Sequence, residues 1–217
     1  CLAVRRPCFL GLYRTGQLAV TNRWGIGHVY ILDVASGRSV ETLGSFSGDE
    51  QEHERTDQLL NCPRGLARSR DALYVLDAGN QRLRRLGDDG VFTGSSPLGT
   101  ARAVQSDPQD VALLPDGRVC VTFAPPSVEF RTKSSNSPMH VFRPSFDASH
   151  DGVVRFGSNA RFGRFGRFGR AWGELLQPRG CCGWGAEIFV ADAANHRVLA
   201  YDASSLACLR MLGHGGA

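Results

Sequence analysis

The sequence predicts an all-β protein built from repeated four-stranded antiparallel sheets, and three observations support this. Short apolar runs of about four to six residues recur along the chain, as buried strands require. Many of its 26 glycines stand between these runs, where turns are expected. The third observation is an internal repeat, because residues 63–86 and 178–201 match without a gap.

The two matching segments read PRGLARSRDALYVLDAGNQRLRRL and PRGCCGWGAEIFVADAANHRVLAY. Two weaker copies begin at Pro7 and Pro108, which indicates a unit of about 40–45 residues with insertions. The strong copies share five positions in one register, each pair 115 residues apart: Pro63 and Pro178, Gly65 and Gly180, Asp77 and Asp192, Asn80 and Asn195, Arg82 and Arg197.

Each copy divides into four short strands, which in the last copy we expect at 181–182, 188–191, 198–201 and 206–212. One such sheet cannot bury both of its faces, so neighbouring sheets must cover one another. Sheets stacked in this way around an axis form a β-propeller. We therefore expect one propeller domain over residues 1–217, with blades at 7–46, 61–95, 106–157 and 176–213 and insertions near 47–60 and 123–138.

The segments DAGN and DAAN predict the turns of the two strong copies. We expect Asp77 and Asp192 to accept hydrogen bonds from backbone amides two residues further on. Asn80 and Asn195 tolerate the left-handed conformation that closes a hairpin. These four residues are therefore predicted to be structural.

At DAGNQRLRRL and DAANHRVLAY the chain resembles the NHL-repeat family, whose name comes from an Asn-His-Leu signature. Asn195-His196-Arg197-Val198 is the better match, and the Pro-x-Gly opening of the family stands at 63–65 and 178–180. The resemblance implies a propeller that usually has six blades. The four blades found here therefore either belong to a six-bladed ring or close a small ring.

The resemblance implies several functions, because the family includes RNA-binding and protein-binding propellers, sensor domains and a zinc-dependent lyase. The lyase carries His at the Pro-x-Gly openings. This chain has Arg64, Gln109 and Arg179 there, and a guanidinium does not bind zinc. The six histidines show no metal-binding spacing, so we expect no metal, no cofactor and no catalytic residue.

The same three opening residues give a binding hypothesis. If the openings line the mouth of a central channel, Arg64 and Arg179 would attract an anionic group there, with Gln109 beside them. The alternative is that Pro-Arg-Gly is a common variant of the opening and that its arginines are solvated.

The segment RFGRFGRFGR at 161–170 interleaves basic and aromatic residues, a pattern that can pair phosphates and stack bases. It gives an RNA-binding hypothesis. The alternative is triplet expansion within a glycine-rich loop. The residues that would bind RNA are Arg161, Arg164, Phe165, Arg167 and Arg170.

Composition excludes few of these functions. The formal charge of +4 does not require a nucleic-acid partner, and no apolar run is long enough for a membrane helix. Seven cysteines form no even framework, and no signal segment precedes the first copy, which favours the cytoplasm. The sequence thus predicts a non-catalytic binding module for a protein or peptide. RNA binding is the first alternative and a propeller hydrolase or lyase the second; the oligomeric state is not predicted.

Overall fold

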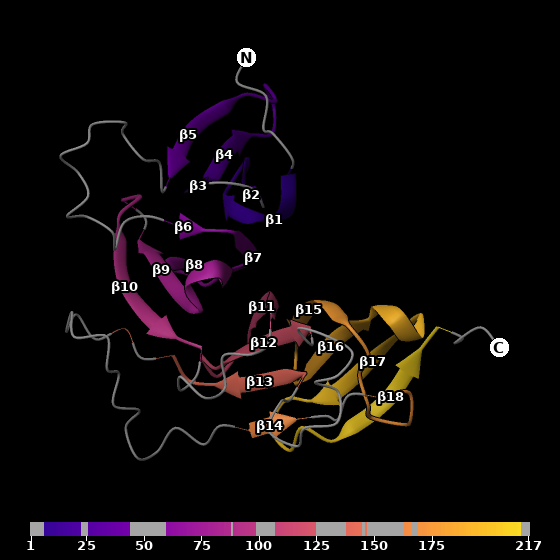
Figure 1. Ribbon diagram of the computed structural model, residues 1–217. Coiled ribbons are helices and arrows are strands. Elements are labelled where there is room, and N and C mark those ends of the chain that lie inside the picture. The colour runs from indigo at the N-terminus through magenta and orange to yellow at the C-terminus, as the bar shows by residue number, and fades with distance from the viewer. Residues whose placement is uncertain are drawn as a thin grey trace. The chain divides into compact units, whose positions relative to one another are not determined.

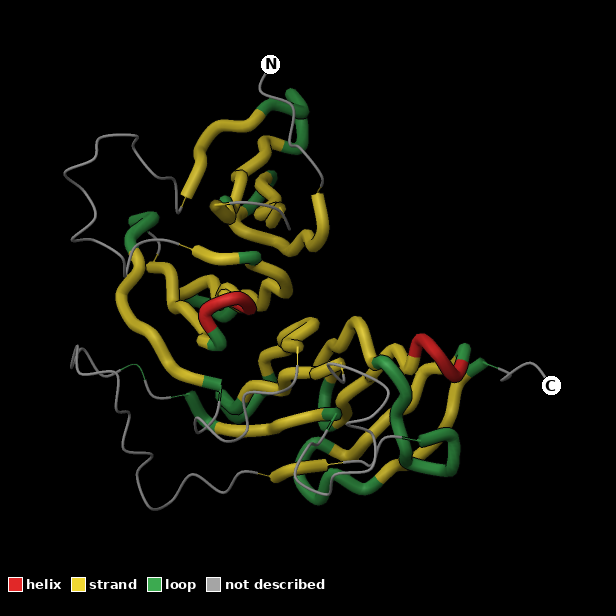
Figure 2. Tube along the Cα trace, in the orientation of Figure 1, coloured by secondary structure: helices red, strands yellow, loops and turns green. Residues whose placement is uncertain are grey.

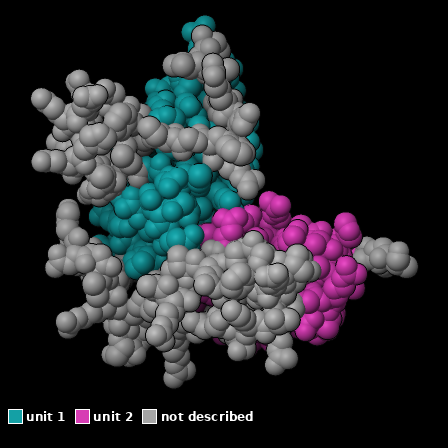
Figure 3. All heavy atoms as spheres, viewed as in Figure 1, with its two compact units in different colours: residues 1–98, 146–150 teal, residues 99–145, 151–217 magenta. Residues whose placement is uncertain are grey.

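The computed structural model describes residues 7–22, 26–43, 60–87, 89–98, 107–124, 138–144, 146, 163–165 and 169–213. The chain folds as two compact units, residues 1–98 with 146–150 and residues 99–145 with 151–217 (Figure 3). Strands dominate the described part of both units, and the only helices there are short 3-10 turns (Figure 2). No helix in these ranges is long and apolar enough to cross a bilayer.

Unit 1 contains two four-stranded antiparallel sheets, each with its strands in chain order (Figure 1). Sheet 1 consists of β1 (Pro7–Arg14), β2 (Gln17–Asn22), β4 (Val29–Asp33) and β5 (Ser39–Leu43). Sheet 2 consists of β7 (Pro63–Arg68), β8 (Ala72–Asp77), β9 (Arg82–Gly87) and β10 (Phe92–Pro97). A short ladder pairs β3 (Ile26–Gly27), which stands between β2 and β4 in the chain, with β6 (Leu60–Asn61), which precedes β7.

Unit 2 repeats this plan with two more antiparallel sheets. Sheet 3 consists of β11 (Asp107–Leu113), β12 (Val119–Ala124), β13 (Met139–Phe142) and β14 (Gly163–Phe165). Sheet 4 consists of β15 (Pro178–Trp184), β16 (Glu187–Asp192), β17 (Arg197–Asp202) and β18 (Cys208–Leu212). The prediction of repeated four-stranded sheets is therefore confirmed, and the four strands of the last copy stand where they were expected.

The third copy extends further than its sequence indicated. We expected it to end near residue 157, with residues 161–170 in a loop, but its fourth strand is β14, which pairs with β13. The segment repeats every three residues, so its sequence does not show the period of two that indicates a strand. The expected insertions fall largely outside the described residues, except that Leu60 belongs to β6 and Phe123 and Ala124 belong to β12.

Each unit is held together by apolar side chains between its two sheets. Strand alternation places one face of each sheet toward its neighbour. In unit 1, Ala19 and Ile31 of sheet 1 pack in one cluster with Leu73, Val75 and Leu86 of sheet 2. In unit 2 the corresponding cluster joins sheets 3 and 4. Burial of one such side chain contributes about 1.5–3 kcal/mol, so these clusters are the main source of stability.

A buried carboxylate closes each of the two strong copies. Asp77 is fully buried and accepts hydrogen bonds from the Asn61 backbone N–H at 2.7 Å, from Asn80 Nδ2 at 2.8 Å and from Arg82 Nε at 2.6 Å. Asp192 repeats the arrangement in unit 2, where its partners are the Leu176 backbone N–H, Asn195 and Arg197. Each carboxylate thus ties the segment before the first strand of a sheet to the turn after the second strand.

This geometry corrects the expected turn mechanism. Neither aspartate caps the 3-10 turn that follows it, Ala78–Asn80 or Ala193–Asn195. Both carboxylates instead accept from the preceding segment, 16 residues earlier in the chain. The residues with left-handed backbone in these turns are Gln81 and His196, with φ of 53° and 54°. Each asparagine instead ends its 3-10 turn, and its side chain donates a hydrogen bond to the aspartate.

Two side-chain hydrogen bonds connect neighbouring sheets within the units. Thr21 on β2 donates to the Arg64 carbonyl at 3.0 Å, and Thr122 on β12 donates to the Arg179 carbonyl at 3.1 Å. Unit 2 adds a bond from the Cys181 backbone N–H to Asp110 Oδ2 at 2.9 Å. Burial raises the pKa of Asp110 to about 6, although the Cys181 and Val111 amides partly offset the effect. The junction of sheets 3 and 4 therefore contains a carboxyl that titrates near neutral pH.

We expect Asp77→Ala to destabilise the fold by about 3–5 kcal/mol, because it removes the buried carboxylate that pairs with Arg82 and accepts from the Asn61 amide. Asp71→Ala is the matched control, since Asp71 also pairs with an arginine but is 70% exposed. The control should cost far less, because an exposed ion pair contributes little to stability. Urea unfolding followed by circular dichroism measures both, and equal losses would contradict a special role for the buried carboxylate.

The Asp110 carboxyl predicts a pH-dependent stability. Its folded-state pKa of about 6 lies above the ordinary 3.8, so its contribution is fully present below about pH 4 and is lost as the pH rises through 6. The stability of Asp110→Asn relative to the wild type should thus increase by about 2–3 kcal/mol between pH 4 and 7.

Unfolding curves of both proteins across this pH range measure the trend. Asp202→Asn serves as the control. Hydroxyl and amide donors of Ser204 and Ser205 lower the pKa of Asp202, so its carboxyl stays ionised throughout. A flat difference for Asp110→Asn would show that the wild-type carboxyl is not desolvated in solution.

Candidate functional site

The predicted opening residues all lie on or at the start of first strands. Arg64 is on β7, Gln109 on β11 and Arg179 on β15. Within each unit the first strands of the two sheets lie side by side, β1 with β7 and β11 with β15. In unit 2 this brings two of the predicted residues together, since Arg179 Nη1 donates to Gln109 Oε1 at 3.5 Å.

Gln109 is a rigid neighbour for Arg179. Its side chain is only 3% exposed, and its Nε2 donates to the Asp107 carbonyl at 3.0 Å and to the Asp107 carboxylate at 2.9 Å. These two bonds fix the amide plane and direct Oε1 toward the guanidinium. The Arg179 backbone is fixed as well, through its carbonyl and Thr122. The exposed Arg179 side chain therefore projects from a well-held position.

Arg64 differs from Arg179 although both stand in a Pro-Arg-Gly opening. The Arg64 side chain is buried, with 6% of its surface exposed, and the residue belongs to unit 1. Among the described opening residues, an exposed guanidinium is thus found at Arg179. The two Pro-Arg-Gly openings thus differ in the exposure of their arginines, because the sequence motif does not determine how much of each side chain the neighbouring strands cover.

Three cysteines lie near this site on the junction of sheets 3 and 4. The buried Cys120 on β12 faces Cys181 on β15, whose Sγ lies 3.8 Å from the Cys120 carbonyl oxygen. The neighbouring Cys120 thiol and burial raise the pKa of Cys181, and partial burial together with Asp110 raises that of Cys182. Both groups are therefore protonated thiols at neutral pH and weak nucleophiles.

The described residues contain no group of three or more His, Cys, Asp or Glu side chains placed to hold a metal ion. The chemistry that the site offers is recognition. One exposed cation stands beside an amide oxygen of sheet 3, and its backbone carbonyl accepts a hydrogen bond from Thr122 of the same sheet.

The described residues of the RNA hypothesis lie on two different segments. Arg164 and Phe165 lie on β14, opposite His140 and Met139 of β13. Arg170 is exposed in the segment that leads to β15, and the carbonyl of the preceding Gly169 accepts a bond from Asn195. Arg161 and Arg167 lie outside the described residues.

Sequence reasoning missed Thr21, Thr122 and Asp110, which hold the openings in place. Their partners lie between 43 and 71 residues away in the chain, so no local pattern shows the contact. One signal was available, because both threonines follow a valine on the second strand of a copy, in LAVTN and in VCVTF.

No protein-family model matches the chain, and the search of curated proteins finds no matching sequence. Solved structures do match it. A nidogen/laminin complex has a TM-score of 0.56 at 13% identity over 92% of this chain and 60% of that chain. A streptogramin B lyase has a TM-score of 0.56 at 11% identity, over 94% and 53%. A gluconolactonase from Xanthomonas campestris has 0.56 at 16% identity, over 96% and 61%.

These sequence identities are too low for the function of one chain to be inferred from another. The resemblance to the NHL-repeat family stays a prediction. The chain spans between about half and three fifths of the length of these structures. Together with the four antiparallel sheets, they show the fold. The sheets of this chain are the blades of a β-propeller.

Proposed function

We propose that this chain is a binding module in which Arg179, positioned by Gln109, recognises a carboxylate of a protein or peptide partner. The observation that carries the proposal is the exposed Arg179 guanidinium held beside the buried, doubly bonded Gln109. Arginine presents a planar set of donors that matches a carboxylate.

Preorganisation supports this assignment. A partner gains affinity when the groups that it meets are already ordered, because less conformational entropy is lost on binding. Thr122 holds the Arg179 backbone, and Asp107 holds Gln109, so only the guanidinium itself must become ordered. Its bond to Gln109 is long at 3.5 Å, which leaves the remaining N–H groups for a ligand.

The propeller fold by itself does not choose between binding and catalysis. One similar structure is a nidogen/laminin complex, whereas a lyase and a gluconolactonase share the same fold. The choice therefore rests on the residues of this chain. Near Arg179 the thiols of Cys181 and Cys182 have raised pKa values, which is unfavourable for nucleophilic catalysis.

We also propose that the four sheets belong to one NHL-type propeller domain. The repeated Asp-x-x-Asn-x-Arg hydrogen-bond network supports this, because it occurs in both units with the same three kinds of partner.

Fluorescence anisotropy with labelled peptides tests the binding proposal. The probes are an Asp/Glu-rich peptide, a Lys-rich peptide of equal length and a single-stranded RNA. We expect the acidic peptide to bind the wild type and to lose about tenfold in affinity with Arg179→Ala, since one charge-assisted contact is worth about 1.5–3 kcal/mol.

Arg70→Ala is the control, because Arg70 is also exposed but lies in the β7–β8 turn of unit 1. It should leave the affinity unchanged. Equal binding of the acidic and Lys-rich peptides, or equal losses in both variants, would contradict the proposal. Salt-sensitive binding of the RNA alone would favour the RNA alternative.

A further inference from the structure

Two cysteines face each other where sheets 3 and 4 pack together. Cys120 lies on β12 and is fully buried, and Cys181 lies on β15 and is half-buried. The Cys120 side chain is a hydrogen-bond partner of the Cys181 thiol, and Cys181 Sγ lies 3.8 Å from the Cys120 carbonyl oxygen. Both are free thiols, and they stand 61 residues apart in the chain. The fold therefore brings together two oxidisable sulfurs from different sheets.

Polar contacts hold the backbone on both sides of this pair. Thr122, two residues after Cys120, donates to the Arg179 carbonyl. Arg179 stands two residues before Cys181, whose own backbone N–H donates to Asp110. Cys120 itself lies in the middle of β12, which is paired with a strand on either side. The two thiols are thus presented to each other by well-held backbone.

Unit 1 shows that packing alone does not require cysteine at these two positions. The threonine two residues further along each second strand shows that Ala19 on β2 corresponds to Cys120. The register of the two strong copies makes Leu66 the counterpart of Cys181. Ala19 and Leu66 pack in the apolar cluster of unit 1, as the two cysteines do in unit 2. Aliphatic side chains therefore suffice for this contact, and a thiol at both positions adds a chemical property.

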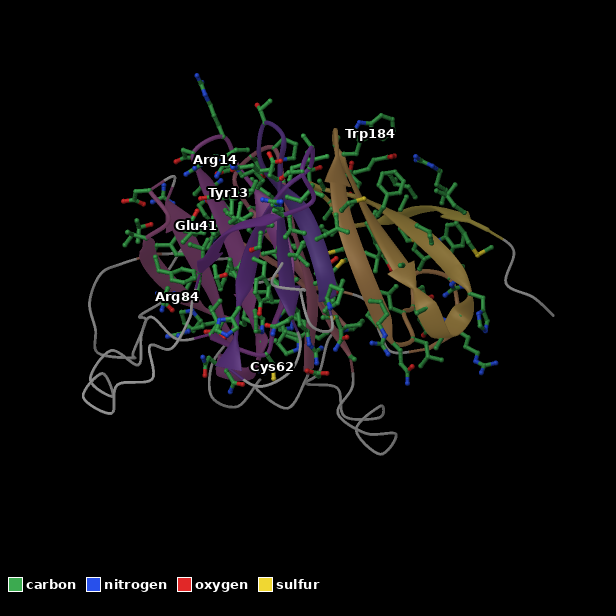
Figure 4. The ribbon with its side chains drawn as sticks, turned by 90° about the horizontal axis from the view of Figure 1, so that it is seen from above. Tyr13, Arg14, Glu41, Cys62, Arg84 and Trp184 are labelled. Carbon is green, nitrogen blue, oxygen red and sulfur yellow. The ribbon has the colours of Figure 1, made fainter. Side chains whose placement is uncertain are left out.

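Cys182 is placed differently, although it follows Cys181 directly in the chain. Strand alternation turns its side chain to the opposite face of β15, and the residue is exposed. Trp184, two residues further along and 77% exposed, marks this outer side at the end of β15 (Figure 4). Cys182 is therefore a matched control thiol, on the same strand but on the face that points away from sheet 3.

We propose that Cys120 and Cys181 form an intramolecular disulfide when the protein meets a small-molecule disulfide of the glutathione class, and that this bond ties sheet 3 to sheet 4. Two thiols that already lie in contact need little movement to reach the S–S distance of about 2 Å. The inference concerns the junction of the two sheets and does not depend on the proposed function.

The reaction consists of two successive thiol–disulfide exchanges. The Cys181 thiol loses its proton, and its sulfur attacks one sulfur of the oxidant. The S–S bond of the oxidant breaks, and the displaced thiolate takes up a proton. The Cys120 thiol then loses its proton, and its sulfur attacks Cys181 Sγ, which releases the second small thiol. The two cysteines lose two electrons and two protons, and the oxidant is reduced to two thiols. Cys181 reacts first because Cys120 is the more deeply buried.

The surroundings of the pair favour the oxidised form once it is made. The neighbouring thiol and burial raise the pKa of Cys181, so the reduced form is not stabilised as a thiolate. The same effect makes the exchange slow at neutral pH, because the thiolate is the attacking species. The disulfide joins residues 61 positions apart and so lowers the conformational entropy of the unfolded chain. We therefore expect a slowly formed cross-link that stabilises unit 2.

Oxidised glutathione in a mildly alkaline buffer, added to the reduced 217-residue chain, tests the proposal. We expect the mass of the monomer to fall by that of two hydrogen atoms. Tryptic mapping should then show the peptide of residues 119–131 joined to that of residues 180–197. Because the second peptide contains both Cys181 and Cys182, the mapping is repeated on Cys182→Ala, which should form the same link.

Urea unfolding provides the second measurement. Oxidation should raise the urea midpoint of the wild type and of Cys182→Ala, and a reductant should reverse the rise. The double variant Cys120→Ala with Cys181→Leu reproduces the aliphatic pair that unit 1 has at these positions. We expect this double variant to fold and to have the same midpoint in both redox states.

A wild type that stays reduced would overturn the proposal, and so would a link between Cys181 and Cys182 or between two chains. Loss of the link in Cys182→Ala, or a glutathione adduct that persists on Cys181, would show that Cys120 and Cys181 do not react with each other. An unchanged urea midpoint after the link has formed would contradict the tie between the sheets.

Discussion

Packing of one sheet face on the next is the interaction on which the rest of this structure depends. A four-stranded sheet of alternating apolar residues has two faces to cover, and in each unit the neighbouring sheet covers one of them. Because the contact runs along the first strands, it brings β1 beside β7 and β11 beside β15. The position of every opening residue follows from this packing.

Polar contacts refine what the apolar packing establishes. A neutral hydrogen bond such as that from Thr122 to the Arg179 carbonyl contributes about 1 kcal/mol, less than one buried leucine. The hydrogen bond matters mainly because it is directional and so fixes which backbone atoms lie next to each other. The carboxylates of Asp77 and Asp192 also fix which segments meet, but the free energies involved are larger because both carboxylates are buried. Each has all of its hydrogen bonds only when both of the segments that it joins are in place.

The same packing rule explains where the Arg179 side chain lies. Arg179 stands where two first strands meet, so neighbouring sheets hold its backbone while its side chain reaches solvent. Among the described residues, Leu12 of sheet 1 and Trp184 of sheet 4 are large apolar side chains that stay exposed.

The sequence alone determined the all-β class, the four sheets and most strand positions of the last copy, because strand alternation and turn residues are local signals. It also placed Gln109 and Arg179 at equivalent points of their copies. Only the tertiary structure decided that Arg64 is buried while Arg179 is exposed, and that Asp110, Thr21 and Thr122 hold the openings. Those outcomes depend on contacts between sheets far apart in the chain, and burial depends on which neighbour covers a side chain.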